Sequence, residues 1–227
     1  MAEPAQLAIR RNFARPAAEE IAPFLNAPTG WVVDAQGRRG ALLHWIKPLT
    51  RQSRFVGTAL TVRTRPVDNL APYAALKFAR PGDVLVVAVD GDATTSILGD
   101  ILLGMARNAG VVAAVTDGLV RDIAGIDQVG MPVFAQGLSP NSPFKDGPGE
   151  IGGIISLGGV TIAAGDLLVG DIDGVVVVPR ANVGTVSAEL AAIAAKEATM
   201  EQVVKGGAPY PPWLDDVLKS DRVRYLD

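Results

Sequence analysis

Gly110-Val111-Val112-Ala113-Ala114-Val115-Thr116-Asp117-Gly118-Leu119-Val120-Arg121-Asp122 is the stretch that decides the fold of this chain. Residues 110–115 are all glycine, alanine or valine, which is typical of a parallel strand covered on both faces. A glycine turn follows, and Arg121 and Asp122 then stand where a helix is expected to begin. In open α/β sheets the ligand crevice lies beyond the carboxyl ends of the strands, so this charged pair indicates a functional site.

Strands and helices alternate on both sides of this stretch. Alternating or continuous apolar runs predict strands at residues 57–65, 83–89 and 131–138. Helical spacing and capping residues, including Thr29 as a cap, predict helices at residues 16–25, 29–36, 70–79, 99–108 and 123–128. Residues 139–153 are rich in proline, glycine and serine and are long enough to form either a mobile or a functional loop.

The second half of the chain is richer in strands. Residues 159–162 lead into two strands within residues 165–179, joined by a tight turn in which Gly174 is available for a positive φ angle. A long helix is expected at residues 181–205, before Gly206 and Gly207. Early alternation followed by a strand-rich block and a long helix predicts layered α/β architecture. We expect a single domain, because no repeat or linker separates two cores.

Composition excludes several classes of protein. The chain has 227 residues, is 48% hydrophobic and 20% charged, and carries a net charge of −3, which gives no electrostatic footprint for nucleic acid. A local basic stretch is either a solvated face or a binding patch, and we favour the solvated face; it contains Arg51, Arg54, Arg63 and Arg65. Residues 1–16 lack an apolar signal core, and no apolar run approaches the roughly 20 residues of a spanning helix, so we expect a cytoplasmic protein without a membrane partner.

Familiar catalytic chemistries are also disfavoured. The chain has no cysteine, and its one histidine, His44, is expected to be a packed or edge residue rather than a catalyst. Neither a Walker A motif nor the strand-turn-helix setting of a dinucleotide site surrounds the glycines at 147–153. A serine hydrolase would normally need that histidine as its base, and no Gly-x-Ser-x-Gly elbow accompanies it. The remaining chemistry is that of carboxylates, arginine and a hard metal ion.

Four short motifs in order carry a resemblance to a known family: Gly99-Asp100-Ile101-Leu102, residues 116–122, Pro132-Val133-Phe134-Ala135 and residues 165–180. Over roughly residues 20–205 the chain resembles the family of 4-hydroxy-4-methyl-2-oxoglutarate/4-carboxy-4-hydroxy-2-oxoadipate aldolases and the regulator of ribonuclease activity A. The resemblance implies a single α/β/β/α sandwich domain of swivelling type across residues 1–227, with extensions at 1–15 and 207–227. It also implies a homotrimer or hexamer with active sites between subunits.

The resemblance implies a role for each matched residue. Substrate binding falls to Gly99, Asp100, Ile101 and Leu102, with pyruvate against the Ile101 and Leu102 amides; a helix N-terminus suits a carboxylate. Arg121 would hold the oxygens of the keto acid and stabilise the enolate. Asp122 would bind Mg²⁺ or Mn²⁺, hard cations that prefer carboxylate and water.

Two further acids follow by matching. Asp34 and Glu197 stand where the aldolases carry acids from a neighbouring subunit, which would move a proton at the substrate. Each assignment has a structural alternative. Arg121 and Asp122 also suit an ion pair, Asp100 a charge at a helix end, and Asp34 and Glu197 solvated helix surfaces.

One position departs from the family pattern. The resemblance places an acid three residues after Asp122, on the same helix face, and here that residue is Gly125. Asp127 cannot replace the acid, because it lies on nearly the opposite side of the helix. We therefore expect Gly125→Glu to strengthen metal-dependent activity.

The resemblance leaves two functions open. One is a divalent-metal-dependent pyruvate aldolase that cleaves a 4-hydroxy-2-oxo acid, with oxaloacetate decarboxylation as a second activity of the same site. The other is a non-catalytic, ribonuclease-regulator-like protein-binding module, a branch in which the aspartate after the arginine is typically not retained. Asp122 therefore favours the enzyme. Arg38, Arg39 and Lys145 are candidates to meet a distal carboxylate of the substrate.

Overall fold

The core of the molecule is a nine-stranded sheet built around β3 (Phe55–Thr64). The computed structural model describes residues 6–226, so residues 1–5 and residue 227 of the predicted terminal extensions lie outside the described residues. β3 runs parallel to β4 (Asp83–Ala88), which is followed by β6 (Ala113–Thr116) and β8 (Val133–Ala135). Every residue of β6 is buried, as its small β-branched sequence predicts.

The other edge of β3 is shared by two strands. Its first half pairs with β13 (Leu167–Asp171), which forms a hairpin with β14 (Gly174–Val178). Gly174 has a φ of 146°, which confirms the positive φ predicted for the turn. The second half of β3 pairs with β10 (Gly149–Ile151), and the sheet is completed by β1 (Leu7–Ile9) and β2 (Lys47–Pro48).

Two small sheets complete the strands. The first is the antiparallel pair β11 (Ile154–Leu157) and β12 (Val160–Ala163). The second is the parallel set β5 (Ser96–Leu98), β7 (Leu119–Val120) and β9 (Gly137–Leu138). The run expected as one strand at 131–138 is therefore divided between two sheets, β8 and β9. Because the strands of the second set are parallel, their carboxyl ends lie together.

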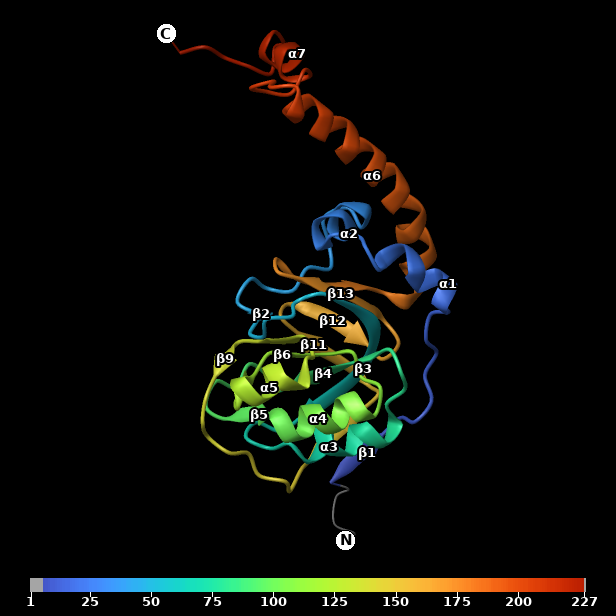
Figure 1. Cartoon of the computed structure of the whole chain (residues 1–227), viewed down its shortest axis with the longest axis vertical. Helices are drawn as coiled ribbons and strands as arrows, with labels where there is room; N and C mark the ends of the chain where they lie inside the picture. Colours follow the sequence, from blue (N-terminus) through green and yellow to red (C-terminus); the bar gives the residue numbers. More distant parts are fainter. Residues whose placement is uncertain (1–5, 227) are drawn as a thin grey trace.

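Three apolar layers separate the four layers of secondary structure (Figure 1). The first lies between the sheet and α3 (Leu70–Ala75), α4 (Asp100–Asn108) and α5 (Ile123–Val129). The second lies between the part of the sheet formed by β4, β6 and β8 and the β13–β14 hairpin with the β11–β12 pair. The third lies on the other face of the hairpin, against α2 (Thr29–Ala35) and α6 (Val183–Lys205). Along β13, Leu168 faces the second layer and Leu167 faces the third, as the period of a strand requires. The α/β/β/α prediction is confirmed.

The remaining short elements are α1 (Ala18–Ile21), η1 (Ala22–Phe24), η2 (Leu76–Phe78), η3 (Arg180–Asn182) and α7 (Leu214–Leu218). The predicted cap of α2 is wrong, because Pro28 occupies the cap position. Thr29 instead donates its amide and its hydroxyl to the Asp171 carboxylate, each at 2.8 Å. The Thr29 hydroxyl, which the local sequence predicted to cap the helix, therefore donates to a carboxylate that is distant in sequence.

The last long helix, α6, leads away from the body of the molecule (Figure 1). It has 23 residues, and those it buries, Val183, Val186 and Leu190, lie in its first half. Across residues 6–226, none of the helices combines the length and the apolar character needed to cross a membrane.

Candidate functional site

A cavity of about 110 Å³ lies beside the N-terminus of α4. It is bounded by α3, by the turn between β7 and α5, and by the loop of residues 139–148. Its lining comprises Asn69, Tyr73, Ser96, Ile97, Leu98, Gly99, Asp100, Ile101, Leu102, Arg121, Asp122, Ser142, Pro143 and Lys145. All six residues predicted around the Gly99 motif and the Arg121-Asp122 pair therefore meet in one place.

The parallel β5–β7 pairing brings these motifs together. The Arg121 amide donates to the Leu98 carbonyl at 3.0 Å, so the segments that follow the two strands leave the sheet side by side. Gly99 is the cap of α4, and a Cβ built on it would lie 3.0 Å from Asp122 Oδ2. A side chain at 99 would therefore crowd the carboxylate, which explains glycine at this position.

Asp122 adopts a backbone conformation that non-glycine residues rarely take. Its φ of 60° and ψ of 40° are left-handed, a region that aspartate enters more readily than most residues other than glycine. It occupies the cap position of α5, yet its side chain caps no helix amide, although aspartate usually does so there. The carboxylate instead pairs with Arg121, Nε to Oδ2 at 3.2 Å. This strained residue thus presents its charge to the cavity rather than to its own helix.

Arg121 is held from two sides. Besides its pairing with Asp122, its Nη1 donates to Ser142 Oγ on the 139–148 loop. The predicted structural ion pair therefore exists, and it lies within the cavity lining. A guanidinium fixed in this way is oriented before any ligand arrives, which suits recognition of an oxyanion.

Asp100 occupies the space above Gly125. Its Oδ1 accepts the Ile101 amide at 2.7 Å, and a Cβ built on Gly125 would lie 2.8 Å from the Asp100 Cβ and closer still to Oδ2. Glycine at 125 therefore leaves room for a carboxylate that comes from the neighbouring helix. This geometry reverses the expectation for Gly125→Glu, because the added side chain must displace Asp100.

The 139–148 loop is fastened to the start of α3 by buried Asp68. Its carboxylate accepts the amides of Asp146, Gly147 and Leu70 at 2.7, 3.0 and 2.9 Å, and the Arg65 guanidinium at 3.2 Å. Burial raises the pKa of Asp68, but these donors outweigh it and hold the pKa below its ordinary value. Of the two alternatives for this loop, the anchored arrangement beside the cavity favours a functional one.

Sequence reasoning missed four polar residues of the lining. Asn69 is the cap of α3 and Tyr73 lies within that helix, Ser96 begins β5, and Ser142 comes from the anchored loop. The Asp68-Asn69 pair ahead of a predicted helix was a usable signal, since such residues typically cap helices. Ser142 carried none, because its partner Arg121 is 21 residues away in sequence.

Comparison with known proteins matches the part of the chain that contains the cavity motifs. The family model described as RraA-like, Aldolase/RraA, matches residues 29–177. A Halalkalibacterium halodurans protein named "Putative 4-hydroxy-4-methyl-2-oxoglutarate aldolase" is 42% identical over 160 residues, which cover 70% of this chain and 76% of that protein.

The chain belongs to the RraA-like family.

Two solved structures support the same relationship. An uncharacterized protein from Pseudomonas syringae pv. tomato is 26% identical with a TM-score of 0.75, covering 86% of this chain and 96% of that one. RraAS2 of Streptomyces coelicolor, described as an unusual member of the RNase ES inhibitor RraA family, is 27% identical with a TM-score of 0.73, covering 86% and 99%. The predicted family is thus confirmed, and it includes both aldolase and RNase-inhibitor names.

Two predicted acids of this RraA-like chain do not join the cavity of their own chain. Asp34 is exposed on α2, in a separate hollow with Thr29 and Asp173, and Glu197 is exposed on α6. Figure 1 places α2 and α6 at the opposite end of the body from α4 and α5. Any role of these acids at the cavity requires a second copy of the chain.

The donors in the cavity fit a hard divalent cation. Asp122 and Asp100 both line the cavity, and among residues 6–226 no three His, Cys, Asp or Glu side chains are grouped as a closed metal cage. Mg²⁺ is commonly held by one or two carboxylates, with water and substrate as its other ligands. Asp122 suits this role best, since its carboxylate makes no helix-capping bond.

Other conspicuous charges of this RraA-like chain have structural partners. Asp117 accepts the Val89 and Gly91 amides at 2.8 and 3.0 Å, and burial raises its pKa. The four arginines of the basic stretch also bond within the chain, in the pairs Arg51–Asp127, Arg54–Leu25, Arg63–Glu150 and Arg65–Asp68. The choice between a solvated face and a binding patch stays a prediction.

Proposed function

We propose that this protein is a divalent-metal-dependent aldolase that cleaves a 4-hydroxy-2-oxo acid to pyruvate and a second carbonyl compound. The observation that carries the proposal is the Asp122 carboxylate, held in a strained cap position without capping its helix, beside Arg121 and the N-terminus of α4. The aldolase name of the Halalkalibacterium halodurans relative supports the same reaction class.

The reaction requires an electron sink on the pyruvyl half. Removal of the proton from the C4 hydroxyl lets the C3–C4 bond break, C4 becomes a carbonyl, and the electron pair forms the enolate of pyruvate. Arg121, fixed by Asp122 and Ser142, stabilises the developing enolate oxygen. Mg²⁺ or Mn²⁺ held by Asp122 would supply Lewis-acid polarisation of the 2-oxo group. Protonation of the enolate at C3 then gives pyruvate.

The N-terminus of α4 suits the carboxylate of the pyruvyl half. The Ile101 and Leu102 amides lie in the first turn, where the helix carries partial positive charge. The Ile101 amide donates to Asp100 in the structure, so a bound carboxylate would replace Asp100 as its acceptor. The displaced Asp100 carboxylate would remain above Gly125, within reach of water in the cavity.

We further propose a homotrimer or a dimer of trimers, in which Asp34 and Glu197 of one subunit serve the cavity of another. Both acids are exposed and lie away from their own cavity, and the second half of α6 is exposed as well. Acids delivered in this way would carry the proton between solvent and the C4 hydroxyl or the enolate. The same enolate chemistry would allow oxaloacetate decarboxylation.

A protein-binding module is the second candidate function. The similarity to RraAS2, named for an RNase ES inhibitor family, favours it. The Asp122 carboxylate beside Arg121 favours the enzyme, because an acidic group at the cavity that makes no helix-capping bond can serve as a ligand of a hard cation.

Pyruvate release tests this choice. The purified protein is assayed with 4-hydroxy-4-methyl-2-oxoglutarate and with oxaloacetate, after chelation and after adding Mg²⁺ or Mn²⁺. We expect metal-dependent release that Asp122→Asn abolishes and that Asp215→Asn, an exposed aspartate on α7, leaves unchanged. Metal-independent release would overturn the metal dependence, and no release from either substrate would overturn the aldolase and favour the binding module.

A further inference from the structure

We infer that residues 6–16 form a strap that positions the 139–148 loop of the cavity, with Arg15 as the positioning residue that fastens the strap. This inference rests on the proposed function, because the loop supplies Ser142, which holds Arg121. The strap includes β1 and leads along one side of the body to α1 (Figure 1). It therefore joins the edge of the sheet beside the cavity loop to the helices of the third apolar layer.

One end of the strap holds the end of the cavity loop. The Gln6 carbonyl accepts the Gly149 amide at 2.9 Å, and β1 then pairs with β10 in parallel. A Cβ built on Gly147, within the loop, would lie 2.9 Å from the same Gln6 carbonyl oxygen. β1 is the outer neighbour of β10 in the sheet, so the strap covers the edge to which the loop leads.

The body of the molecule receives the strap on glycines rather than on side chains. Gly152 and Gly165 have φ angles of 76° and 98°. A Cβ on Gly152 would overlap the Arg10 carbonyl oxygen, and one on Gly165 would overlap that of Ala14. Glycine permits both the left-handed backbone and so close an approach of another backbone. The strap therefore lies in a track that a side chain at either position would close.

The other end of the strap is fastened by a buried ion pair. Arg15 Nε and Nη2 donate to the two carboxylate oxygens of Asp83 at 2.7 and 2.8 Å, and the Asp83 side chain is 1% exposed. The Arg15 guanidinium also lies over the Phe13 ring, 4.0 Å from its centroid. Because a buried carboxylate without its cation is strongly disfavoured, this pair holds the strap in place.

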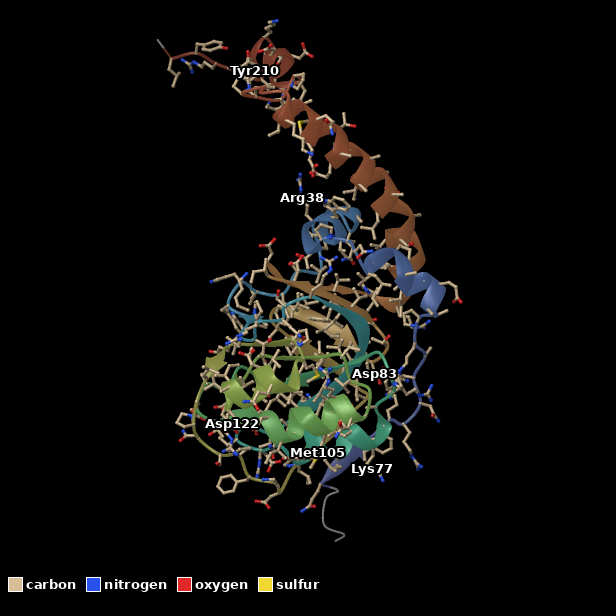
Figure 2. All side chains as sticks on the ribbon, in the orientation of Figure 1. Arg38, Lys77, Asp83, Met105, Asp122 and Tyr210 are labelled. Carbon is tan, nitrogen blue, oxygen red and sulfur yellow. The ribbon has the colours of Figure 1, made fainter. Side chains whose placement is uncertain are left out.

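The fastening is remote from the reacting groups. Figure 2 shows Asp83 on one side of the body and Asp122 on the other. Neither Arg15 nor Asp83 lines the cavity. Any effect of Arg15 on the proposed reaction must therefore pass through the strap and the loop that it holds.

The strap and Asp68 restrain the loop from two directions. Asp68 accepts two loop amides from the side of α3, and the strap holds Gly149 from the edge of the sheet. Without the strap, the loop would spend less time in the arrangement in which Ser142 holds Arg121. A ligand that needs this arrangement binds more weakly in proportion to the fraction lost, whereas the saturated site is unchanged. A positioning role therefore predicts a higher KM with an unaltered kcat.

Gly152→Ala tests the strap without touching the cavity, since the added methyl group must displace the Arg10 carbonyl. Gly91→Ala is the matched control, because its φ is 72° and its Cβ would meet nothing within 4 Å. We expect KM for 4-hydroxy-4-methyl-2-oxoglutarate to rise about fivefold or more in Gly152→Ala, with kcat changed less than about twofold, and neither to change in the control. Arg15→Gln should act in the same way, and Arg15→Lys, which keeps the charge, should lie between it and the native protein. A fall in kcat without a rise in KM in Gly152→Ala would contradict the positioning role.

Hydrogen exchange separates this inference from the aldolase proposal. Without substrate, the amides within residues 142–149 are compared with those of the core strand β6 in the native protein, Gly152→Ala and Gly91→Ala. Exchange about tenfold faster at 142–149 in Gly152→Ala alone, with β6 unchanged, supports the strap even if no substrate is cleaved. Unchanged exchange at 142–149, or equal acceleration in both segments, overturns the inference even if the aldolase activity is present.

Discussion

The cavity beside α4 and the acid-bearing surfaces of α2 and α6 differ in how completely one chain builds them. At the cavity, Arg121 is fixed by Asp122 and Ser142, and the adjoining loop is fixed by buried Asp68. Glu197, in contrast, lies on a helix whose buried residues end at Leu190. A single chain therefore holds Arg121 and its loop in place, whereas the proton transfer that we propose for Asp34 and Glu197 would require a second copy of the chain.

The largest expected effect on kcat comes from a change in the cavity beside α4, which one chain builds by itself. Arg121→Ala removes the fixed donor to the enolate, and we expect kcat to fall by about 10²–10³-fold, as when an oxyanion donor is lost. The melting temperature should change little, because Arg121 and Asp122 are both partly exposed and such ion pairs contribute only about 0–1 kcal/mol. Steady-state kinetics and thermal unfolding check both statements. A loss of less than tenfold would remove Arg121 from the chemistry.

A subunit-mixing experiment tests whether Glu197 on α6 serves the cavity of another subunit. Asp122→Asn and Glu197→Gln should each be inactive or strongly impaired alone. If sites form between subunits, mixed assemblies contain some sites with both native residues, and random mixing restores about one quarter of the native activity. Activity equal to the mean of the two single variants would mean that the two residues act within one chain or that Glu197 has no role.

A moderate effect is expected where the loop is fastened. Asp68→Asn removes the charge that accepts four donors, and we expect a loss of about 1–3 kcal/mol in the free energy of unfolding at pH 7. The pKa of Asp68 is lowered in the fold, so its stabilisation is present above the unfolded value of about 3.9 and is lost as pH falls through the folded value. Unfolding curves should therefore converge for the two proteins in acid. A difference independent of pH would contradict this account.

The cavity contains both residues that local sequence patterns could locate and residues that only long-range contacts bring there. The strand ending at Thr116 and the helix from Asp100 to Asn108 follow from apolar periodicity, so the cavity's central motifs could be located in advance. Ser142 could not, because the Asp68 carboxylate that anchors its loop joins segments 78 residues apart. Local patterns do not encode such a contact.

Two predictions from the sequence were wrong for the same physical reason. The sequence predicted a loop at residues 139–153, which include the strand β10. Gly149–Ile151 is extended because it pairs with β3, not because its residues favour a strand. The Thr29 hydroxyl was expected at a helix cap, but Asp171 accepts it. In both cases a tertiary partner overrode a local preference.

The smallest expected effect concerns the carboxylate that lies over Gly125. Gly125→Ala adds a methyl group 2.8 Å from the Asp100 Cβ, and we expect kcat and metal affinity to fall by about tenfold, less than the 10²-fold cost of a full 1 Å misplacement. Alanine is the better helix former by about 1 kcal/mol, which offsets part of the cost of this overlap. Gly104→Ala on α4 is the matched control, because its added Cβ would meet only a Val129 methyl group at 3.8 Å. Gly125→Glu should be impaired further, and a gain in metal affinity in that variant would mean that an acid at 125, rather than Asp100, belongs at the site.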